Sequence, residues 1–207
     1  MVLASVAVAV ATWRAPVTLK TAEGQVVQSP SNDQWQELQR LGQRRGAAAP
    51  KHIIAEFSDL QCPFCKRFHG VTQELLARRG GEIAHVLVHF PLASHPYARA
   101  MAEAAVCAEE QGALELFVAT MFAYQGTTTS DSWLGVAAHA GVDTLAMQRC
   151  VIRPTTVSRV DRGVEVAKRI GIRGTPTVLV DGRVLPKPPT LLELEALLDS
   201  LDRIARN

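Results

Sequence analysis

Two cysteines separated by two residues are the side chains in this sequence best suited to redox chemistry. Cys62 and Cys65 lie in the run Cys-Pro-Phe-Cys, between an apolar stretch at 52–57 and a segment with helical periodicity. Thiols at this spacing can close a small, reversible disulfide. Pro63 suits the first turn of a helix, where its missing N–H needs no partner. Cys62 therefore falls near a helix N-cap, where free backbone N–H groups and the helix dipole lower the pKa of a thiol.

Two elements must position this pair. The apolar run at 52–57 predicts a buried strand. After Pro63, apolar residues recur at helical spacing with charged and amide residues between them, which predicts an amphipathic helix. Its apolar positions are Phe64, Phe68, Val71, Leu75 and Leu76.

The rest of the chain supplies the elements around them. Residues 17–28 predict a short hairpin, and a capped helix begins at Ser31 and stops at Gly42. A second core strand is expected at 83–90. Helical patterns then follow at 101–107, 114–124, 133–140, 145–151 and 157–170, a strand pair around Asp181-Gly182, and a last helix that opens with a capping box at 190–193.

The sequence argues against most metal and haem sites at the cysteine pair. No second pair of ligands at zinc-site spacing accompanies Cys62 and Cys65. Lys66 follows the second cysteine where attachment of c-type haem needs histidine. We expect His69 to be a solvated helix residue and predict no metal site. Copper(I) capture by the two thiolates stays an alternative.

A second motif, Gly174-Thr175-Pro176, precedes the strand expected at 177–180. Pro176 can be an ordinary proline at the entry of a strand. It can also follow a cis peptide bond that points the backbone of Thr175 at the redox pair. Taken alone, the motif leaves both interpretations open.

Together these features resemble the DsbA-like thiol–disulfide oxidoreductases of the thioredoxin superfamily. The resemblance covers about residues 50–206 and rests on the run 58–65, on Gly174-Thr175-Pro176, and on the separation of 114 positions from Cys62 to Pro176. It implies an α/β fold, a thioredoxin-like central sheet flanked by helices, with an inserted helical domain. The expected organisation is an export signal or membrane-anchor remnant at 1–16, an N-terminal extension at 17–49, a thioredoxin-like domain at 50–92 and 171–207, and the insertion at 93–170.

The resemblance also implies roles for individual residues. Cys62, as the exposed sulfur, and Cys65 are the expected catalytic pair. Glu56 matches the place of an acidic residue beneath the active site, where a buried carboxylate can exchange protons with Cys65. The alternative is a strand glutamate that faces solvent. The residues expected to contact an extended substrate segment are Pro63, Phe64, Thr175 and Pro176.

Cys107 and Cys150 both fall in the expected helical insertion. They can be buried, inert thiols, because free cysteine behaves as a small apolar residue. They can also form a structural disulfide, which the even number of cysteines and an oxidising compartment favour. Neither has a partner two positions away, so both are excluded from the redox centre.

The expected function is exchange of the Cys62–Cys65 disulfide with cysteines of exported proteins, in disulfide formation. Phe64 cannot donate a side-chain hydrogen bond to sulfur, so we expect a milder oxidant than the strongest members of the family. A reductase or isomerase of envelope disulfides, a copper(I)-binding module and a non-catalytic peptide-binding module are the alternatives. We expect a monomer that needs no cofactor, works with a membrane redox partner and, with a net charge of +2, does not bind nucleic acid.

The first eleven residues are apolar apart from Ser5. They fit a short export signal, the last half of a membrane anchor, or a hydrophobic strand of a cytoplasmic protein. Because disulfides persist outside the cytoplasm, we expect an extracytoplasmic protein, in the periplasm or cell envelope, with a possible anchor at its N-terminus. Arg40, Arg44 and Arg45 are expected to be a solvated helix end.

Overall fold

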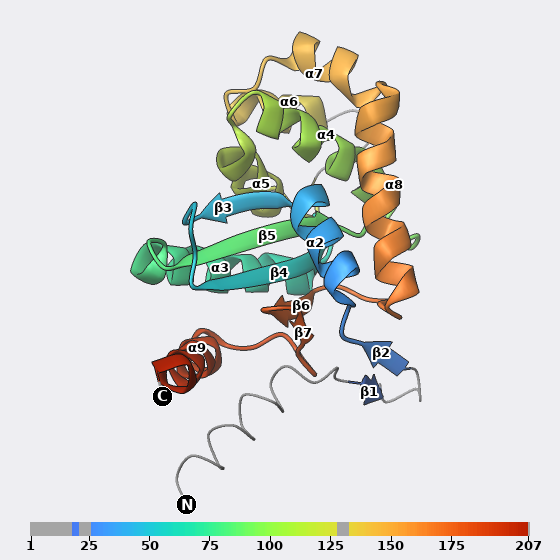
Figure 1. Cartoon of the computed structure of the whole chain (residues 1–207). Coiled ribbons are helices and arrows are strands. Elements are labelled where there is room, and N and C mark those ends of the chain that lie inside the picture. The colour runs from blue at the N-terminus through green and yellow to red at the C-terminus, as the bar shows by residue number, and fades with distance from the viewer. Residues whose placement is uncertain (1–17, 21–25, 128–132, 207) are drawn as a thin grey trace, which may run out of the picture.

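A computed structural model of the chain describes residues 18–20, 26–127 and 133–206 (Figure 1). The export signal or anchor expected at 1–16 lies outside these residues. Across the described ranges, no helix combines the length and the apolar character that a bilayer span requires. The hairpin expected near the N-terminus is present, because β1 (Thr18–Lys20) pairs antiparallel with β2 (Val26–Gln28).

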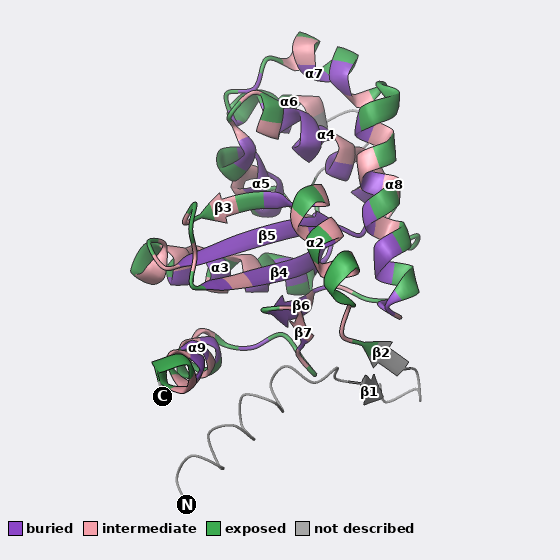
Figure 2. Cartoon of the chain, in the orientation of Figure 1, coloured by how far each residue is buried: buried purple, intermediate pink, exposed green. Residues whose placement is uncertain are grey.

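A five-stranded sheet forms the centre of the molecule, in the order β3-β5-β4-β6-β7. β4 and β5 run parallel, and the other neighbouring pairs are antiparallel. Both parallel strands are buried almost throughout (Figure 2), which explains their nearly continuous apolar sequences. The strands are β3 (Gln43–Gly46), β4 (His52–Ser58), β5 (Ile83–His89), β6 (Thr177–Val180) and β7 (Arg183–Val184).

Helices cover both faces of this sheet. On one face, α3 (Pro63–Arg79) and α9 (Leu191–Arg206) pack against Ile54 and Val178. On the other face, α2 (Asn32–Leu41) and α8 (Pro154–Arg169) pack against Phe57 and Val86 (Figure 1). The alternation of strand side chains between two apolar cores confirms the predicted α/β sheet flanked by helices.

A layer of helices lies between β5 and β6 in the chain. Its core includes Cys62 and Cys65, so the helical layer packs directly on the cysteine pair. A disulfide between Cys107 and Cys150, with their Cα atoms 5.9 Å apart, joins α4 to α7 within this layer. The helices are α4 (Ala98–Glu110), α5 (Leu114–Ala123), α6 (Trp133–His139), α7 (Thr144–Val151) and the long α8.

Strand β3 was not anticipated, because residues 43–46 fall in the segment expected to be an extension and linker. It pairs antiparallel with β5, and Arg45 lies directly opposite His85. The Arg45 side chain is only 8% exposed. The prediction of a solvated helix end is confirmed for Arg40 and wrong for the other two arginines: Arg44 is exposed but lies on β3, and strand pairing turns Arg45 toward a buried partner. Gly46 ends the strand with φ +91°, and a Cβ there would lie 2.4 Å from the carbonyl oxygen of Ile83.

The local signals for helix starts and turns are confirmed. Ser31 Oγ accepts from the backbone N–H of Gln34, and Gln34 Oε1 accepts from that of Ser31. Thr190 and Glu193 form the same reciprocal pair before α9. Asp181 and Gly182, with φ of 49° and 81°, make the tight turn between β6 and β7.

Candidate redox site

Cys62 is the N-cap residue of α3, directly before Pro63 at the first helical position. Its backbone N–H donates to the carbonyl oxygen of Asp59 at 3.0 Å. Its thiol lies 3.3 Å from the carbonyl oxygen of Thr175, and the Thr175–Pro176 peptide bond is cis. The structure thus brings together two motifs that are more than a hundred residues apart in the sequence.

The environment of Cys62 lowers the pKa of its thiol to about 5. The largest cause is the neighbouring Cys65 thiol; burial opposes the shift, and the nearby Thr175 side chain and the backbone N–H groups at Cys65 and Phe64 add to it. These donors all stabilise a negative charge on sulfur. Cys62 is therefore a thiolate at neutral pH.

Cys62 is, however, not the exposed sulfur that we expected. With both cysteines reduced, the residue is only 3% exposed. It belongs to the core of the helical layer, together with Leu60 and Phe122, and Thr175 closes it from the side of β6. The prediction was wrong because it considered the helix start alone, without the layer that packs on it.

Cys65 is fully buried, in the first turn of α3. Its sulfur accepts a hydrogen bond from the backbone N–H of Asp59 at 3.4 Å. Burial, followed by the bond to Cys62 and the negative charge of Glu56, raises the pKa of the Cys65 thiol. The two sulfurs are therefore different at neutral pH, one a thiolate and the other a thiol.

Asp59 organises the loop before the pair, a role that the sequence analysis missed. Its buried carboxylate accepts from the backbone N–H of Gln61 at 2.7 Å, from that of Leu92 at 2.8 Å and from His95 Nδ1 at 2.8 Å. The loop that begins helix α3 is thereby bonded to the loop after β5. The only signal in the sequence was an aspartate directly after a buried strand.

Glu56 is buried beneath the pair, with 2% of the residue exposed, so the solvent-facing alternative is excluded. Its Oε2 lies 3.0 Å from His85 Nε2, and its Oε1 has no hydrogen-bond partner. Arg45 Nη2 lies 3.0 Å from the other ring nitrogen of His85. The sequence analysis did not connect His85 or Arg45 with the site.

The residues expected to contact substrate surround Cys62. Pro63 is exposed, and Phe64 is 57% exposed with the Arg67 guanidinium 4.5 Å from its ring centre. Thr175 is half-buried and Pro176 buried. The exposed Phe64 ring therefore follows Cys62 closely in the chain, and the carbonyl oxygen of Thr175 contacts the Cys62 sulfur.

His69 is half-buried rather than solvated, which corrects our expectation. Its ring lies 5.0 Å from that of Phe122, and burial lowers the pKa of the imidazole to about 4. A search of the described side chains finds no cluster of three or more histidine, cysteine or acidic residues suited to a metal ion.

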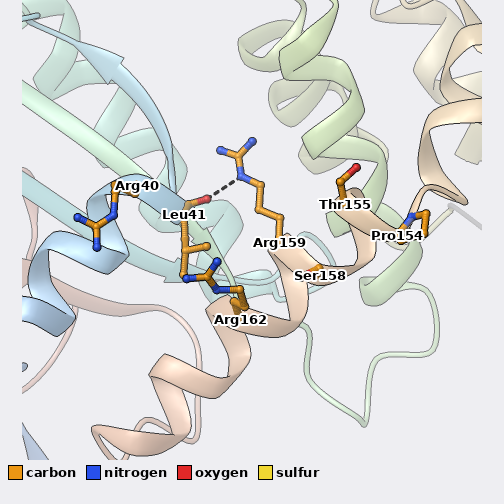
Figure 3. Close-up of a pocket in the computed structure, with 7 residues that line it drawn as sticks. All are labelled: Arg40, Leu41, Pro154, Thr155, Ser158, Arg159 and Arg162. Atoms are coloured by element: carbon orange, nitrogen blue, oxygen red, sulfur yellow. Dashed lines mark hydrogen bonds between the residues drawn. The ribbon is translucent and has the colours of Figure 1, made fainter.

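A groove of about 520 Å³ lies between α2 and α8, apart from the cysteines (Figure 3). Arg159 spans it and donates to the carbonyl oxygens of Leu41 and Gly42. Arg162 is paired with Glu37. The groove therefore joins α8 to the end of α2 and contributes nothing to the site around Cys62. Its lining residues are Arg40, Leu41, Pro154, Thr155, Ser158, Arg159 and Arg162.

Solved structures share this fold at low sequence identity. A thioredoxin-like oxidoreductase from Silicibacter pomeroyi DSS-3 is 24% identical with a TM-score of 0.72, and the match covers 86% of this chain and 99% of that one. The thiol–disulfide exchange protein alpha-DsbA2 from Wolbachia pipientis is 16% identical with a TM-score of 0.73, covering 82% and 92%.

Among curated proteins, the Na(+)/H(+) antiporter NhaA of Herminiimonas arsenicoxydans is 27% identical over 187 residues. That match covers 90% of this chain and 29% of the antiporter, so the chain spans less than a third of this relative. Residues 41–200 match the thioredoxin family. This stretch contains the sheet, the cysteine pair and the Thr175–Pro176 loop, and the chain therefore belongs to the thioredoxin family, with the fold of its DsbA-like members.

Proposed function

We propose that this protein is a thiol–disulfide oxidoreductase that passes the Cys62–Cys65 disulfide to cysteines of exported proteins. The observation that carries the proposal is the thiolate at the start of α3, where the pKa of Cys62 is lowered to about 5. A stabilised thiolate is a good leaving group and a ready nucleophile. Its buried partner Cys65 stands within hydrogen-bond reach.

The same thiolate favours disulfide formation over reduction. Stabilising the Cys62 thiolate stabilises the reduced pair, and a pair with a stable reduced form is a stronger oxidant. A pKa of about 5 lies between about 7 in thioredoxin and about 3.5 in DsbA. We therefore expect an oxidant milder than DsbA, in keeping with a phenylalanine, rather than a side-chain donor, at position 64.

The reaction follows from the asymmetry of the pair. A substrate thiolate attacks Cys62 of the disulfide, and the electron pair of the broken bond leaves with Cys65, which takes up a proton. A second substrate thiolate then attacks the substrate sulfur of the mixed disulfide and releases Cys62 as a thiolate. The substrate gains a disulfide and the pair is reduced by two electrons.

The residues around Cys62 suit an extended substrate segment. Phe64 offers an exposed apolar ring, and the Thr175–Pro176 loop lies against the reactive sulfur. Backbone contacts with such a loop tolerate many sequences, which suits an enzyme that acts on many proteins.

The proposed place of work is outside the cytoplasm, at the cell envelope. The disulfide between Cys107 and Cys150 fits an oxidising compartment. The curated relative is a Na(+)/H(+) antiporter, and this chain matches part of it. An ion antiporter acts in a membrane, which supports a position close to a membrane.

The test compares oxidation of reduced, unfolded ribonuclease by the wild type, Cys62→Ser and Cys65→Ser, together with the equilibrium of the pair against glutathione. We expect catalysis by the wild type alone, and a potential between those of thioredoxin and DsbA. Incubated with oxidised glutathione, Cys65→Ser should accumulate a mixed disulfide between Cys62 and glutathione, with one glutathione thiolate released. A potential at or below that of thioredoxin would overturn the oxidising direction, and equal activity of all three proteins would overturn the function.

A further inference from the structure

Three ionisable side chains form a line across three neighbouring strands beneath the redox pair. Arg45 on β3 lies opposite His85 on β5, and the parallel register places Ile54 opposite His85, so that Glu56 on β4 is its diagonal neighbour. His85 is 1% exposed and Glu56 2%. The line leads from the edge of the sheet to the buried face beneath Cys65.

The direction of each hydrogen bond in this line is fixed by chemistry. A guanidinium can only donate, so Arg45 Nη2 donates to His85 Nδ1 across 3.0 Å. His85 Nδ1 must then carry a lone pair, and the ring proton sits on Nε2. That N–H donates to Glu56 Oε2 across 3.0 Å. Burial, the largest cause, together with the nearby Arg45 charge lowers the pKa of His85, which keeps the ring neutral in this tautomer.

The two oxygens of Glu56 are therefore not equivalent. Oε2 is occupied by the His85 N–H, while Oε1 is buried without a partner. A buried carboxylate oxygen without a hydrogen-bond partner destabilises the fold. This one is nevertheless present, and it is close enough to Cys65 for the charge of Glu56 to act on the Cys65 thiol. Oε1 is the atom left free to accept a proton.

We propose that Arg45 and His85 are positioning residues that hold Glu56 ready to exchange a proton with Cys65. The proposal rests on the proposed function. When Cys65 attacks the Cys62 sulfur of a mixed disulfide, its S–H proton passes to Glu56 Oε1, the Cys62–Cys65 bond forms, and the bound thiol leaves as a thiolate. In the opposite direction, Cys65 leaves with the electron pair and takes that proton back.

The charged and titratable groups around the line come from four elements. Cys65 and His69 face Glu56 from α3, His85 faces it from β5, and Arg45 follows on β3. Glu115 on α5, 66% exposed, lies 3.9 Å from Arg45 Nη1 at the outer end. Gln73 of α3, with its amide turned, also accepts from Arg45 Nη1 at 2.8 Å. These contacts hold the guanidinium in place.

The experiment follows the reduced protein as it reacts with the chromogenic disulfide of thionitrobenzoate in a stopped-flow instrument. Attack by Cys62 releases the first thionitrobenzoate, and attack by Cys65 on the mixed disulfide releases the second. In His85→Leu we expect the second phase to slow by about tenfold at neutral pH, because the Glu56 carboxylate loses the N–H donor that holds it. The first phase should keep its rate.

Further variants separate positioning from folding. Gln at position 85 can still donate an N–H to Glu56, so His85→Gln should recover most of the second-phase rate. Arg45→Met should slow that phase as His85→Leu does, while Arg44→Met, on the exposed side of the same strand, should leave it unchanged. In a Glu56→Gln background, His85→Leu should have no further effect.

Two outcomes overturn different claims. If the wild type releases only one thionitrobenzoate, the pair does not close and the proposed function fails. If the wild type releases two, but His85→Leu and Arg45→Met leave the rate of the second phase unchanged, the function stands and the positioning role is wrong. An equal loss with or without Glu56 would also refute it.

Discussion

Two cysteines three positions apart at the start of one helix differ in ionisation because of what surrounds each sulfur. Cys62 lies before the first turn, close to the Cys65 thiol and to backbone N–H groups, whereas Cys65 is enclosed one turn later with Glu56 beneath it. The sequence places Cys62 at the start of a helix, and this position predicted that its thiol would be acidic. Its burial depends on the helical layer, and no local pattern could predict it.

Alkylation of the reduced protein tests this difference directly. Reaction of Cys62 with iodoacetamide should follow an ionisation with a midpoint at about pH 5, while Cys65 stays unmodified in the folded protein. Mass spectrometry of quenched samples across a pH series gives the rates. Cys62→Ser serves as the control and should lose the reaction. A midpoint near the value of a free thiol, about 8.5, would contradict the structure.

The lowered pKa of Cys62 should also make the stability of the reduced protein depend on pH. Because the pKa of Cys62 is lowered on folding, its contribution to the reduced protein is complete above the pKa of an unfolded thiol and is lost as the pH falls toward about 5. Thermal unfolding should show the midpoint of the reduced protein falling relative to the oxidised protein over this range. A constant difference between the two forms would show that the thiolate is not stabilised.

Single residues were predictable where their neighbours in sequence determine them, and not otherwise. Cys62, Pro63 and Cys65 were identified from spacing alone. Arg45 and His85 were not, because their partners come from the pairing of strands that are about forty residues apart. Asp59 was missed for the same reason, since two of its three hydrogen-bond donors come from the loop after β5.

At the scale of elements, signals within a few residues worked well. The capping pairs before α2 and α9 and the Asp181-Gly182 turn lie where the sequence placed them. Strand β3 is four residues long and polar, so it carries no apolar alternation to detect. Its pairing with β5, rather than its own sequence, makes it a strand.

His52 connects three elements and gives the fold a dependence on pH. Its Nδ1 lies 2.7 Å from Asp181 at the β6–β7 turn, and its Nε2 lies 3.4 Å from Asp202 on α9. The hydrogen bond to Asp181 raises the pKa of His52, against the effect of burial. The contribution of His52 to the stability of the fold is therefore complete below the pKa of an unfolded histidine, about 6.5, and is lost as the pH rises through the higher pKa of the folded state.

Urea unfolding of His52→Gln should show this trend. We expect the variant to lose about 1 kcal/mol relative to the wild type at about pH 6, and a smaller amount at about pH 9. His139→Gln, an exposed histidine on α6, is the matched control and should show no such pH dependence. A loss that grows with pH would mean that His52 stabilises the fold in its neutral form.

At the scale of the whole molecule, the long separation of the two motifs predicted that helices would stand between β5 and β6. The helices are there, and they form a core of their own that encloses Leu60 and both cysteines of the pair. The sequence could give their number and approximate limits but not their docking. Docking depends on contacts such as Gln43 Nε2 to the carbonyl oxygen of Ala105, which join β3 to α4 at 2.7 Å.

The disulfide between Cys107 and Cys150 should stabilise this layer without taking part in exchange. In the chain-entropy model, a loop of 43 residues corresponds to about 4 kcal/mol, so the double variant Cys107→Ala, Cys150→Ala should be less stable by about that amount. Denaturant unfolding measures it. Cys62→Ser keeps the bond and should not show this loss. Equal stability of the double variant and the wild type would leave the bond without a structural role.

Because the Cys62 sulfur is buried, only a cysteine that can enter the site can react with it. Cys62 is only 3% exposed, and Phe64 and Thr175 lie next to it. A cysteine fixed at the surface of a rigid, folded protein would therefore contact these two residues before it reached the sulfur. A cysteine on a loose, unfolded stretch of chain can enter. For the proposed exchange reaction, this geometry predicts faster reaction with a cysteine of an unfolded chain than with the same cysteine in a folded protein, which stopped-flow rates for one substrate in both states would measure.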